Sequence, residues 1–264
     1  MKKKKNIIMV GNFTIDIFNN DNKKIGGSPI YSGFAVYMLG GIPHVVSSIS
    51  NAYENILPPF LSKYKIFNSN NMTTFKLIYK ENGKRDLLLV SISERKLSIE
   101  NHKSDGLIIN PVCNEIDVNT LSNISFPIAV DIQGFVRMCE ENRYVILGNQ
   151  FKLPYNRNYL VVHANYDELS KSMYTVSDLI TTGFKEVLVS YDEDGFITFT
   201  SRNSSYKFKP ENIGPYKTGT GDVLLASYFM YRLNGIDPEK STYLAGKFTE
   251  WFSNSGYRLL SDIG

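Results

Sequence analysis

The sequence predicts an α/β fold in which a largely parallel sheet is covered by helices on both faces. Its length of 264 residues suits a single domain, and 42% hydrophobic and 21% charged residues are typical of a soluble globular protein. Short apolar runs alternate with stretches of helical spacing through the first three quarters of the chain, and two consecutive helices end it. That alternation is typical of parallel sheets built from strand–helix–strand units.

The individual elements follow from this alternation. Two stretches between the apolar runs have helical patterning, Tyr31–Leu39 and Asp167–Thr181. The runs have the length of buried strands. They are Ile7–Val10, Val45–Ile49, Leu107–Ile109, Ile128–Ile132, Leu160–His163 and Val187–Ser190.

Two further segments, Ile15–Ile25 and Thr73–Ser91, alternate without helical spacing, and Asn82-Gly83 within the second is a strong hairpin turn signal. We expect them to leave the main sheet and form a small β lid from about residues 13–26 and 72–92. No linker or internal repeat divides the chain, so residues 1–264 are expected to form one domain.

The last third of the chain predicts two helices, Gly219–Leu233 and Asp237–Phe252. Asn234-Gly235 is typical of a helix end, and Asp237-Pro238 of a new start with aspartate as the N-cap. The segment Thr218-Gly219-Thr220-Gly221-Asp222 therefore stands immediately before a helix.

Composition excludes several classes of function. The net charge of +3 is weak, and a good part of it lies in Lys2–Lys5, a run that is usually solvated, so we expect no nucleic-acid partner. No stretch of about 18 apolar residues predicts a membrane span. Two cysteines, Cys113 and Cys139, do not make a disulfide framework. We expect a cytoplasmic protein, monomeric or homodimeric, without a zinc site, since its histidines are scattered at positions 44, 102 and 163.

The glycine-rich segment before the helix carries the chemistry. Its glycines allow a tight turn, and the first amides of the helix are left to bind an anion such as a phosphate. Asp222 is open to two interpretations: a carboxylate that caps an ordinary helix, or a base that removes the proton of an attacking hydroxyl beside the anion site. The P-loop pattern GxxxxGK[ST] is absent, and the segment lacks the third glycine of GxGxxG.

Several segments together resemble the ribokinase-like (PfkB) carbohydrate kinases. Tyr216–Asp222 matches the family signature DTxGAGD, which implies an anion hole at Gly219, Thr220 and Gly221, a catalytic base at Asp222 and nucleotide contact at Thr218. The N-terminal pattern of Gly11, Asp16 and Gly26-Gly27 is also similar. It implies substrate binding by Asp16 and by the Gly27-Ser28 region.

Two further matches lie on the nucleotide side. Asn165-Tyr166-Asp167-Glu168 resembles the family's NxxE motif, which implies that Asn165 and Glu168 organise Mg²⁺ through water. Without that context the same pattern is a common helix cap. The strand Val187–Ser190 and the residues after it resemble the segment beside the nucleotide phosphates, which implies roles for Ser190, Asp192 and Gly195. Asp192 replaces the family's usual glycine.

Three further segments indicate which subgroup of the family the chain resembles. Asp131–Arg137, together with Asn110–Ile116 and Gly27–Tyr31, is similar to the myo-inositol kinase-like subgroup, which implies substrate contact at Gln133 and Arg137. Both follow a strand whose carboxyl end delivers polar groups to a crevice. The alternative for Arg137 is a surface pair with Glu140 or Glu141.

The family resemblance implies a Rossmann-like three-layer α/β/α core with a small β lid and an ATP- and Mg²⁺-dependent kinase acting on a hydroxyl of a small polyol or sugar. Tyr216, in place of the signature aspartate, removes the reason to expect activation by potassium. Thr220 leaves open the related kinases of pyridoxal or hydroxymethylpyrimidine, since GTGD also occurs there. A regulator that keeps the fold and has lost catalysis is the remaining alternative.

Overall fold

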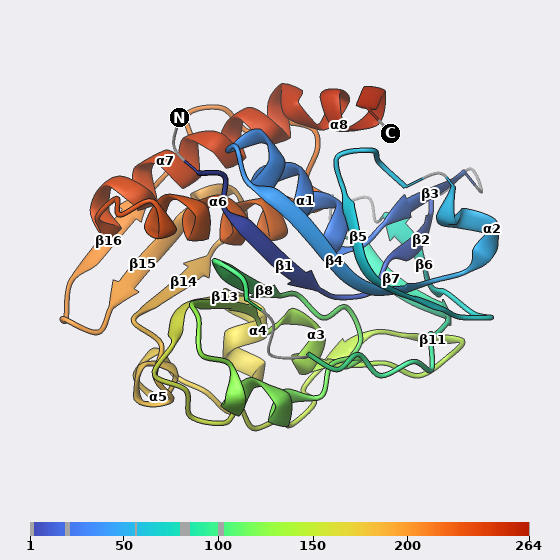
Figure 1. Cartoon of the computed structure of the whole chain (residues 1–264), viewed down its shortest axis with the longest axis horizontal. Coiled ribbons are helices and arrows are strands. Elements are labelled where there is room, and N and C mark those ends of the chain that lie inside the picture. The colour runs from blue at the N-terminus through green and yellow to red at the C-terminus, as the bar shows by residue number, and fades with distance from the viewer. Residues whose placement is uncertain (1–2, 19–21, 56, 80–84, 100–102, 264) are drawn as a thin grey trace.

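The computed structural model describes residues 3–18, 22–55, 57–79, 85–99 and 103–263. Its main element is a nine-stranded sheet in the order β16-β15-β14-β13-β9-β8-β1-β4-β5 (Figure 1). Seven neighbouring strands, from β14 to β5, are parallel, and β15 and β16 add an antiparallel edge. The strands are β1 (Asn6–Val10), β4 (Ile42–Ile49), β5 (Ser62–Asn68), β8 (Gly106–Ile109), β9 (Ile128–Asp131), β13 (Tyr159–Asn165), β14 (Glu186–Ser190), β15 (Phe196–Thr200) and β16 (Ser205–Phe208).

Helices cover both faces of this sheet (Figure 1). One layer holds α1 (Ser28–Met38), α6 (Thr220–Leu233), α7 (Pro238–Trp251) and α8 (Tyr257–Ile263), and a π-helical turn, Phe252–Gly256, joins the last two. The other holds the shorter α3 (Gln133–Val136), α4 (Tyr166–Lys171), α5 (Val176–Thr181) and the 3₁₀ helix Val118–Asn123. A single helical turn, α2 (Asn51–Glu54), follows β4.

Each face of the sheet has its own apolar core, because successive strand residues point to opposite sides. In β1, Ile7 and Met9 pack in the core under α1 and α6, whereas Ile8 and Val10 pack in the opposite core. A strand buried on both faces reads as a continuous apolar run, which is why the sequence located these strands. The three-layer α/β/α prediction is confirmed.

A second, five-stranded sheet has the order β11-β7-β6-β2-β3, and we call it the small sheet. Its strands are β2 (Thr14–Ile17), β3 (Lys23–Gly26), β6 (Thr73–Tyr79), β7 (Arg85–Ser91) and β11 (Arg143–Tyr144). The two segments that the sequence assigned to a lid thus form strands outside the main sheet, while their function as a lid stays a prediction. The turn signal Asn82-Gly83 lies outside the described residues.

Two expectations need correction. Asp167–Thr181 is not one helix: α4 ends at Lys171, and Thr175 begins α5 as an N-cap that accepts from the Asp178 amide. The Thr175 side chain caps a new helix and so competes with continuation of α4. The helical spacing of the sequence continues through this break, and for that reason it predicted one helix. In addition, Cys113 and Cys139 form one disulfide across a sequence separation of 26, whereas the sequence predicts no disulfide framework. A short strand β10 (Arg137–Met138), paired with β12 (Ile146–Leu147), carries the chain to Cys139.

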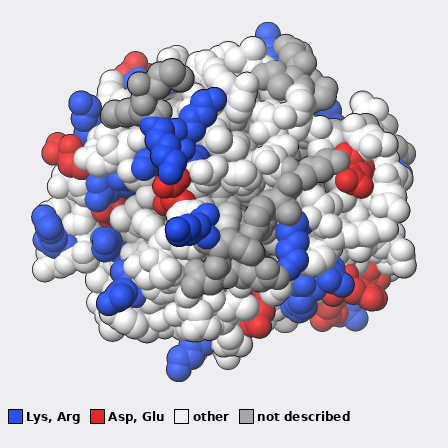
Figure 2. Space-filling view, viewed as in Figure 1, with Lys and Arg blue, Asp and Glu red and all other residues white. Residues whose placement is uncertain are grey.

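On the face viewed in Figure 2, basic side chains are more widespread than acidic ones. Figure 2 shows lysine and arginine side chains interspersed with acidic ones and separated by uncharged surface. Among the described helices, none combines the length and the hydropathy that a membrane crossing requires.

Candidate active site

A glycine or a polar residue stands at the end of each of five neighbouring strands of the main sheet, on the face that α6 covers. By strand register, Gly11 follows β1 beside Asn110, Asn110 lies beside Asp131, and Asp131 pairs with His163. Each stands two residues beyond an apolar residue of the α6-side core and therefore points to the same face. Ser190 ends β14 on this face as well. The sheet thus presents a row of polar groups at its carboxyl edge.

The N-terminus of α6 lies over this row. Gly219 is its N-cap, with the left-handed φ of 79° that glycine adopts freely. A Cβ here would lie 2.3 Å from the ring of Tyr31, a buried residue of α1. A Cβ on Gly221 would lie 3.0 Å from Cε1 of His163. The glycine turn is therefore packed between an α1 aromatic ring and a β13 imidazole, with the first helical amides at its open end.

Asp222 is the third residue of α6, and its side chain is fixed from the sheet. Asn110 Nδ2 donates to Asp222 Oδ1 at 2.8 Å and to Ser32 Oγ at 3.0 Å. Burial raises the pKa of the Asp222 carboxyl to about 7, with help from the negative charge of Asp131. The Asn110 hydrogen bond and the charges of His163 and Arg137 oppose that rise. A carboxyl with this pKa exchanges protons near neutrality, which suits a general base.

His163 lies in the middle of the row, with both ring nitrogens bonded. Nδ1 lies 2.7 Å from Asp131 Oδ2, and Nε2 lies 3.1 Å from Ser190 Oγ. His163 is 4% exposed and Asp131 is 3% exposed. Burial alone lowers the pKa of His163, but the charge and hydrogen bond of Asp131 outweigh it, so the pKa lies above its ordinary value.

Asn165 and Glu168 form a capping box at the start of α4. Asn165 Oδ1 accepts from the Glu168 amide at 2.8 Å, and Glu168 Oε2 accepts from the Asn165 amide at 2.9 Å. Glu168 is buried, and its burial together with the charge of Asp131 raises its pKa, against the opposing charges of Arg137 and His163. The pair caps α4, and the Glu168 carboxyl also belongs to a cluster of ionisable groups with Asp131, Arg137 and His163.

These residues suit a hydrated magnesium ion better than a protein-only cage. Within the described ranges, no three His, Cys, Asp or Glu side chains converge as metal ligands. Mg²⁺ retains several waters and needs only one or two protein oxygens together with substrate phosphates. The Asn165 and Glu168 side chains fit this arrangement, in which a few protein oxygens hold the hydrated ion.

Arg137 is partly buried and points toward this cluster. Its Nη1 donates to the Val112 carbonyl at 3.2 Å, and its guanidinium lies 5.9 Å from the centre of the Phe75 ring. Its charge acts on both Glu168 and Asp222. The acidic residues suggested as alternative partners have other contacts, because Glu140 pairs with Arg143 and Glu141 accepts from the Ile92 amide.

The substrate residues predicted from the N-terminal pattern also gather here. Asp16 is buried in β2, accepts from Thr14 Oγ1 at 2.9 Å and lies against Gly26. Ser28, next to Gly27 at the start of α1, donates to the Asn110 carbonyl at 2.5 Å. Tyr31 lies within electrostatic reach of both Asp16 and Asp222. The first turn of α1 therefore lies between the two carboxylates.

The remaining predicted residues lie at the rim of the site. The Gln133 amide donates to Asp131 Oδ1 at 2.8 Å. After β14, Asp192 adopts a left-handed φ of 48°, a conformation that glycine, the residue that the family resemblance implies here, adopts more freely. Gly195 accepts from the Tyr191 amide and closes that loop. Next to Thr218, Lys217 pairs with Glu193 of the same loop at 2.6 Å.

The sequence missed four residues of the site: Tyr31, Asn110, Asp131 and His163. In the sequence, Tyr31, Asn110 and Asp131 stand out only as members of segments that resemble the family, and His163 is one of three scattered histidines. Asn110 directly follows β8, and Asp131 and His163 lie at the carboxyl ends of β9 and β13, which was the available signal for these three. Tyr31, within α1, carries no such signal. The pairing of Asp131 with His163 needs the strand order, since 32 residues separate them in the chain.

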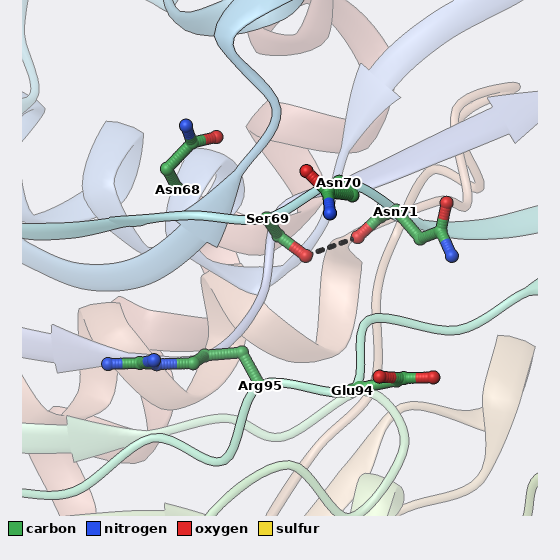
Figure 3. A pocket seen from close by; sticks show the side chains of 6 residues that line it. All are labelled: Asn68, Ser69, Asn70, Asn71, Glu94 and Arg95. Carbon is green, nitrogen blue, oxygen red and sulfur yellow. Dashed lines mark hydrogen bonds between the residues drawn. The ribbon is translucent and has the colours of Figure 1, made fainter.

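A separate polar pocket of about 290 Å³ lies between the end of β5 and the segment after β7 (Figure 3). Ser69 Oγ donates to the Asn71 carbonyl there. The pocket contains none of the residues predicted for catalysis. Its lining is Asn68, Ser69, Asn70, Asn71, Glu94 and Arg95.

Solved structures identify the fold. No family model matches the chain, and no curated protein matches it in sequence. A pyrophosphate-dependent kinase in the ribokinase family, complexed with a pyrophosphate analog and myo-inositol, is similar with a TM-score of 0.76 and 17% identity, over 94% of this chain and 95% of that one. The chain therefore has the ribokinase fold.

Two other kinases of this fold are also similar. The nucleoside kinase of Methanocaldococcus jannaschii, described as an archaeal member of the ribokinase family, gives a TM-score of 0.71 and 12% identity, over 99% of both chains. Ribokinase of Arabidopsis thaliana, complexed with ribose and ATP, gives 0.66 and 13%, over 95% of this chain and 93% of that one. At these identities the likeness concerns the fold, which agrees with the fold class predicted from sequence.

Proposed function

We propose that this protein is a kinase that transfers a phosphoryl group to a hydroxyl of a small polyol or sugar, with Asp222 as the general base. The observation that carries the proposal is the Asp222 carboxylate, held by Asn110 beside the glycine turn and with a pKa of about 7. A base with that pKa is about half ionised at neutral pH and accepts a proton readily.

In the proposed mechanism, the acceptor and the transferring phosphoryl group meet at the N-terminus of α6. The acceptor would be held by Asp16 and the Gly27-Ser28 region, with Gln133 and Arg137 as further contacts. Asp222 would remove the proton of the attacking hydroxyl. The amides of residues 219–222 would bind the transferring group, whose negative charge the helix dipole favours. Most of the acceleration in phosphoryl transfer comes from such positioning and charge stabilisation.

For the donor we propose ATP, as in the Arabidopsis thaliana ribokinase complex. Ser190, Asp192, Gly195 and Thr218 would contact it at the rim. Mg²⁺, held through water by Asn165 and Glu168, would neutralise donor phosphate charge. Pyrophosphate is the donor to compare, since it serves the similar kinase complexed with myo-inositol.

The acceptor class rests on the resemblance in sequence and on the myo-inositol of the similar kinase. We propose an inositol-like polyol, with sugars and nucleosides as the next compounds to test. The small sheet would close over the acceptor and exclude water, which suppresses hydrolysis of the donor. Pyridoxal and hydroxymethylpyrimidine belong in the same panel.

The test is an assay of donor consumption with this panel, with ATP or pyrophosphate as donor and Mg²⁺ present. We expect Asp222→Asn to lower turnover by about 10²- to 10⁴-fold, because the amide cannot accept the proton. Binding of ATP, measured by calorimetry, should persist.

Asp178→Asn is the matched control. Asp178 is also the third residue of a helix, α5, and it lies in an exposed capping box with Thr175. Its replacement should leave turnover unchanged. Retention of more than about a tenth of wild-type turnover by Asp222→Asn would exclude Asp222 as the base. A wild-type protein that binds donor and acceptor without transfer would instead favour a regulator.

A further inference from the structure

A buried hydrogen-bonded chain lies directly beneath the glycine turn. It runs from Asp131 through the imidazole of His163 to Ser190, and so links the ends of β9, β13 and β14. The two bonds fix both ring nitrogens and therefore the plane and position of the ring. The proposed mechanism gives His163 and Asp131 no contact with the donor or the acceptor.

The ring of His163 is in contact with the turn above it. A Cβ on Gly221 would lie 3.0 Å from Cε1 and 3.7 Å from Nδ1, so the backbone of the turn rests on the imidazole without a side chain between them. The other side of the turn rests on the ring of Tyr31 at Gly219. The rings of His163 and Tyr31 thus determine the position of the first amides of α6 relative to the sheet.

We propose that His163, oriented by Asp131 and Ser190, is a positioning residue that holds the Thr220-Gly221-Asp222 turn in the geometry required for phosphoryl binding and transfer. This inference rests on the proposed function. Its physical basis is that a displacement of about 1 Å in a catalytic group can cost about 10²-fold in rate. Loss of the ring would leave space beneath Gly221 into which the turn can settle.

Charged groups approach His163 from three of the elements around it, while the neighbour from β14, Ser190, is uncharged. Asp131 approaches from β9, Glu168 from α4 and Asp222 from α6. Asp131 is the one whose carboxylate is hydrogen-bonded to the ring, and its other oxygen accepts from the Gln133 amide. The pair is therefore anchored on the sheet and on the first turn of α3 at once, which makes it a rigid support.

The acceptor side has separate supports. Asp16 is held by Thr14 Oγ1 and lies against Gly26, and these contacts do not involve His163. Removal of the imidazole should therefore lower kcat and weaken anion binding, while the KM for the acceptor stays within about twofold. A merely structural residue would lower the melting temperature and leave the kcat of the folded protein unchanged.

The experiment compares His163→Ala with His44→Ala. His44 lies near the start of β4, toward the opposite edge of the sheet, where Nε2 is 2.9 Å from Asn6 Oδ1. Binding of inorganic pyrophosphate is measured by calorimetry, kcat and KM by the donor-consumption assay, and both are repeated with added imidazole. We expect His163→Ala to lose at least tenfold in pyrophosphate affinity and about 10²-fold in kcat. Imidazole should restore part of both, and His44→Ala should show neither loss nor response.

A second variant guards against misfolding. His163→Gln keeps a donor for Asp131 but lacks the ring beneath Gly221, so its kcat should also fall at least tenfold. The double variant His163→Ala/Asp131→Ala should lose no more than the worse single variant, since the two act as a unit. Wild-type kcat and pyrophosphate affinity in a folded His163→Ala or His163→Gln protein would overturn the proposal. Calorimetry keeps this test independent of whether any acceptor is phosphorylated.

Discussion

At the scale of single residues, the site is defined by how Asp222 is held. Its carboxylate lies at a helix N-terminus, where most aspartates are simply caps, and the sequence could not decide between the two interpretations. The structure supplies the difference. Asn110 donates directly to the carboxylate, while burial and Asp131 raise its pKa to about 7. A capping aspartate in water, such as Asp178, has a lowered pKa instead, because Thr175 donates to it.

This arrangement predicts a specific pH dependence. If Asp222 must be ionised, kcat falls below pH 7 by about tenfold per pH unit, following protonation of the base. The Asn110 hydrogen bond lowers the pKa of Asp222, so Asn110→Leu should raise that pKa and move the acidic limb upward by about one pH unit. The measurement is kcat against pH from 5 to 9.

Asn156→Leu is the control for this prediction. Asn156 is equally buried, but its amide donates to the Leu121 and Ile124 carbonyls, away from Asp222. That variant should lose stability and keep the wild-type acidic limb. An unchanged limb in Asn110→Leu would show that Asn110 does not control the ionisation of Asp222.

The site residues that the sequence did not predict show which contacts a single sequence does not reveal. Asp222 follows from its glycine-rich neighbours, which are local in the chain. Asn110 and His163 carry no local signal beyond their place at the carboxyl end of a strand. Their partners are set by strand order, which brings Asp131 beside His163 and Asn110 beneath α6. Those contacts depend on topology, and a single sequence does not contain it explicitly.

At the scale of elements, the start of α6 is the part on which function depends most. Its N-cap, Gly219, combines a left-handed φ of 79° with the Tyr31 ring, which lies 2.3 Å from the position that a Cβ would take. The second helix of this pair begins differently, with Asp237 accepting from the Lys240 amide. The sequence predicted both starts correctly, because both rest on local capping chemistry. It failed between α4 and α5, where the helical spacing continued across the turn.

Two glycines at the ends of α6, Gly219 and Gly235, allow the cost of a left-handed backbone to be separated from the cost of a clash with Tyr31. Gly235, just after the end of α6, has a φ of 81°, but no atom lies within 4 Å of the position that a Cβ would take there. Gly235→Ala should therefore cost only the strain of the left-handed backbone, about 1–2 kcal/mol, and keep full turnover. Gly219→Ala adds a clash with Tyr31, so it should cost more stability and lower kcat at least tenfold. Denaturant unfolding and the kinase assay test both variants. Equal effects of the two substitutions would contradict the importance of the Tyr31 contact.

At the scale of the whole molecule, the small sheet and the main sheet meet around a third apolar cluster. Phe75, Leu77 and Leu89 of β6 and β7 pack there against Val112 and Cys113, which follow β8 of the main sheet. Cys139, bonded to Cys113, lies at its edge, between β10 and β11. The disulfide therefore joins the loop after Asn110 to the chain segment that leads from Arg137 into the small sheet.

The sequence predicted the two sheets but not this connection. Alternating residues over 15–25 and 73–91 marked strands that leave the main sheet, because their period of two is a local property. The pairing of β2 with β6, and the disulfide between residues 26 apart, are distant contacts that local patterns do not specify. The same limit applies to the site and to the fold: what is local in the chain was predictable, and what depends on packing was not.

The position of the disulfide leads to a prediction about the relative stability of the two sheets. A bond closing a loop of this size typically stabilises a protein by about 3 kcal/mol, by restricting the unfolded chain. Reduction, or the double variant Cys113→Ser/Cys139→Ser, should lower the free energy of unfolding by that amount. Because the bond ties the cluster beneath the small sheet, amide hydrogen exchange should accelerate in β6 and β7 more than in β9 and β13.

Comparison of the wild-type protein and the double serine variant, each with and without reductant, separates the bond from the side chains. The wild-type protein should respond to reductant in unfolding and in exchange, whereas the double serine variant should not respond. The KM for the acceptor should rise in the reduced protein, because Arg137 is two residues from Cys139 and bonds the carbonyl of Val112, the neighbour of Cys113. Uniform acceleration of exchange in both sheets would show that the bond stabilises the molecule as a whole and has no particular connection to the small sheet.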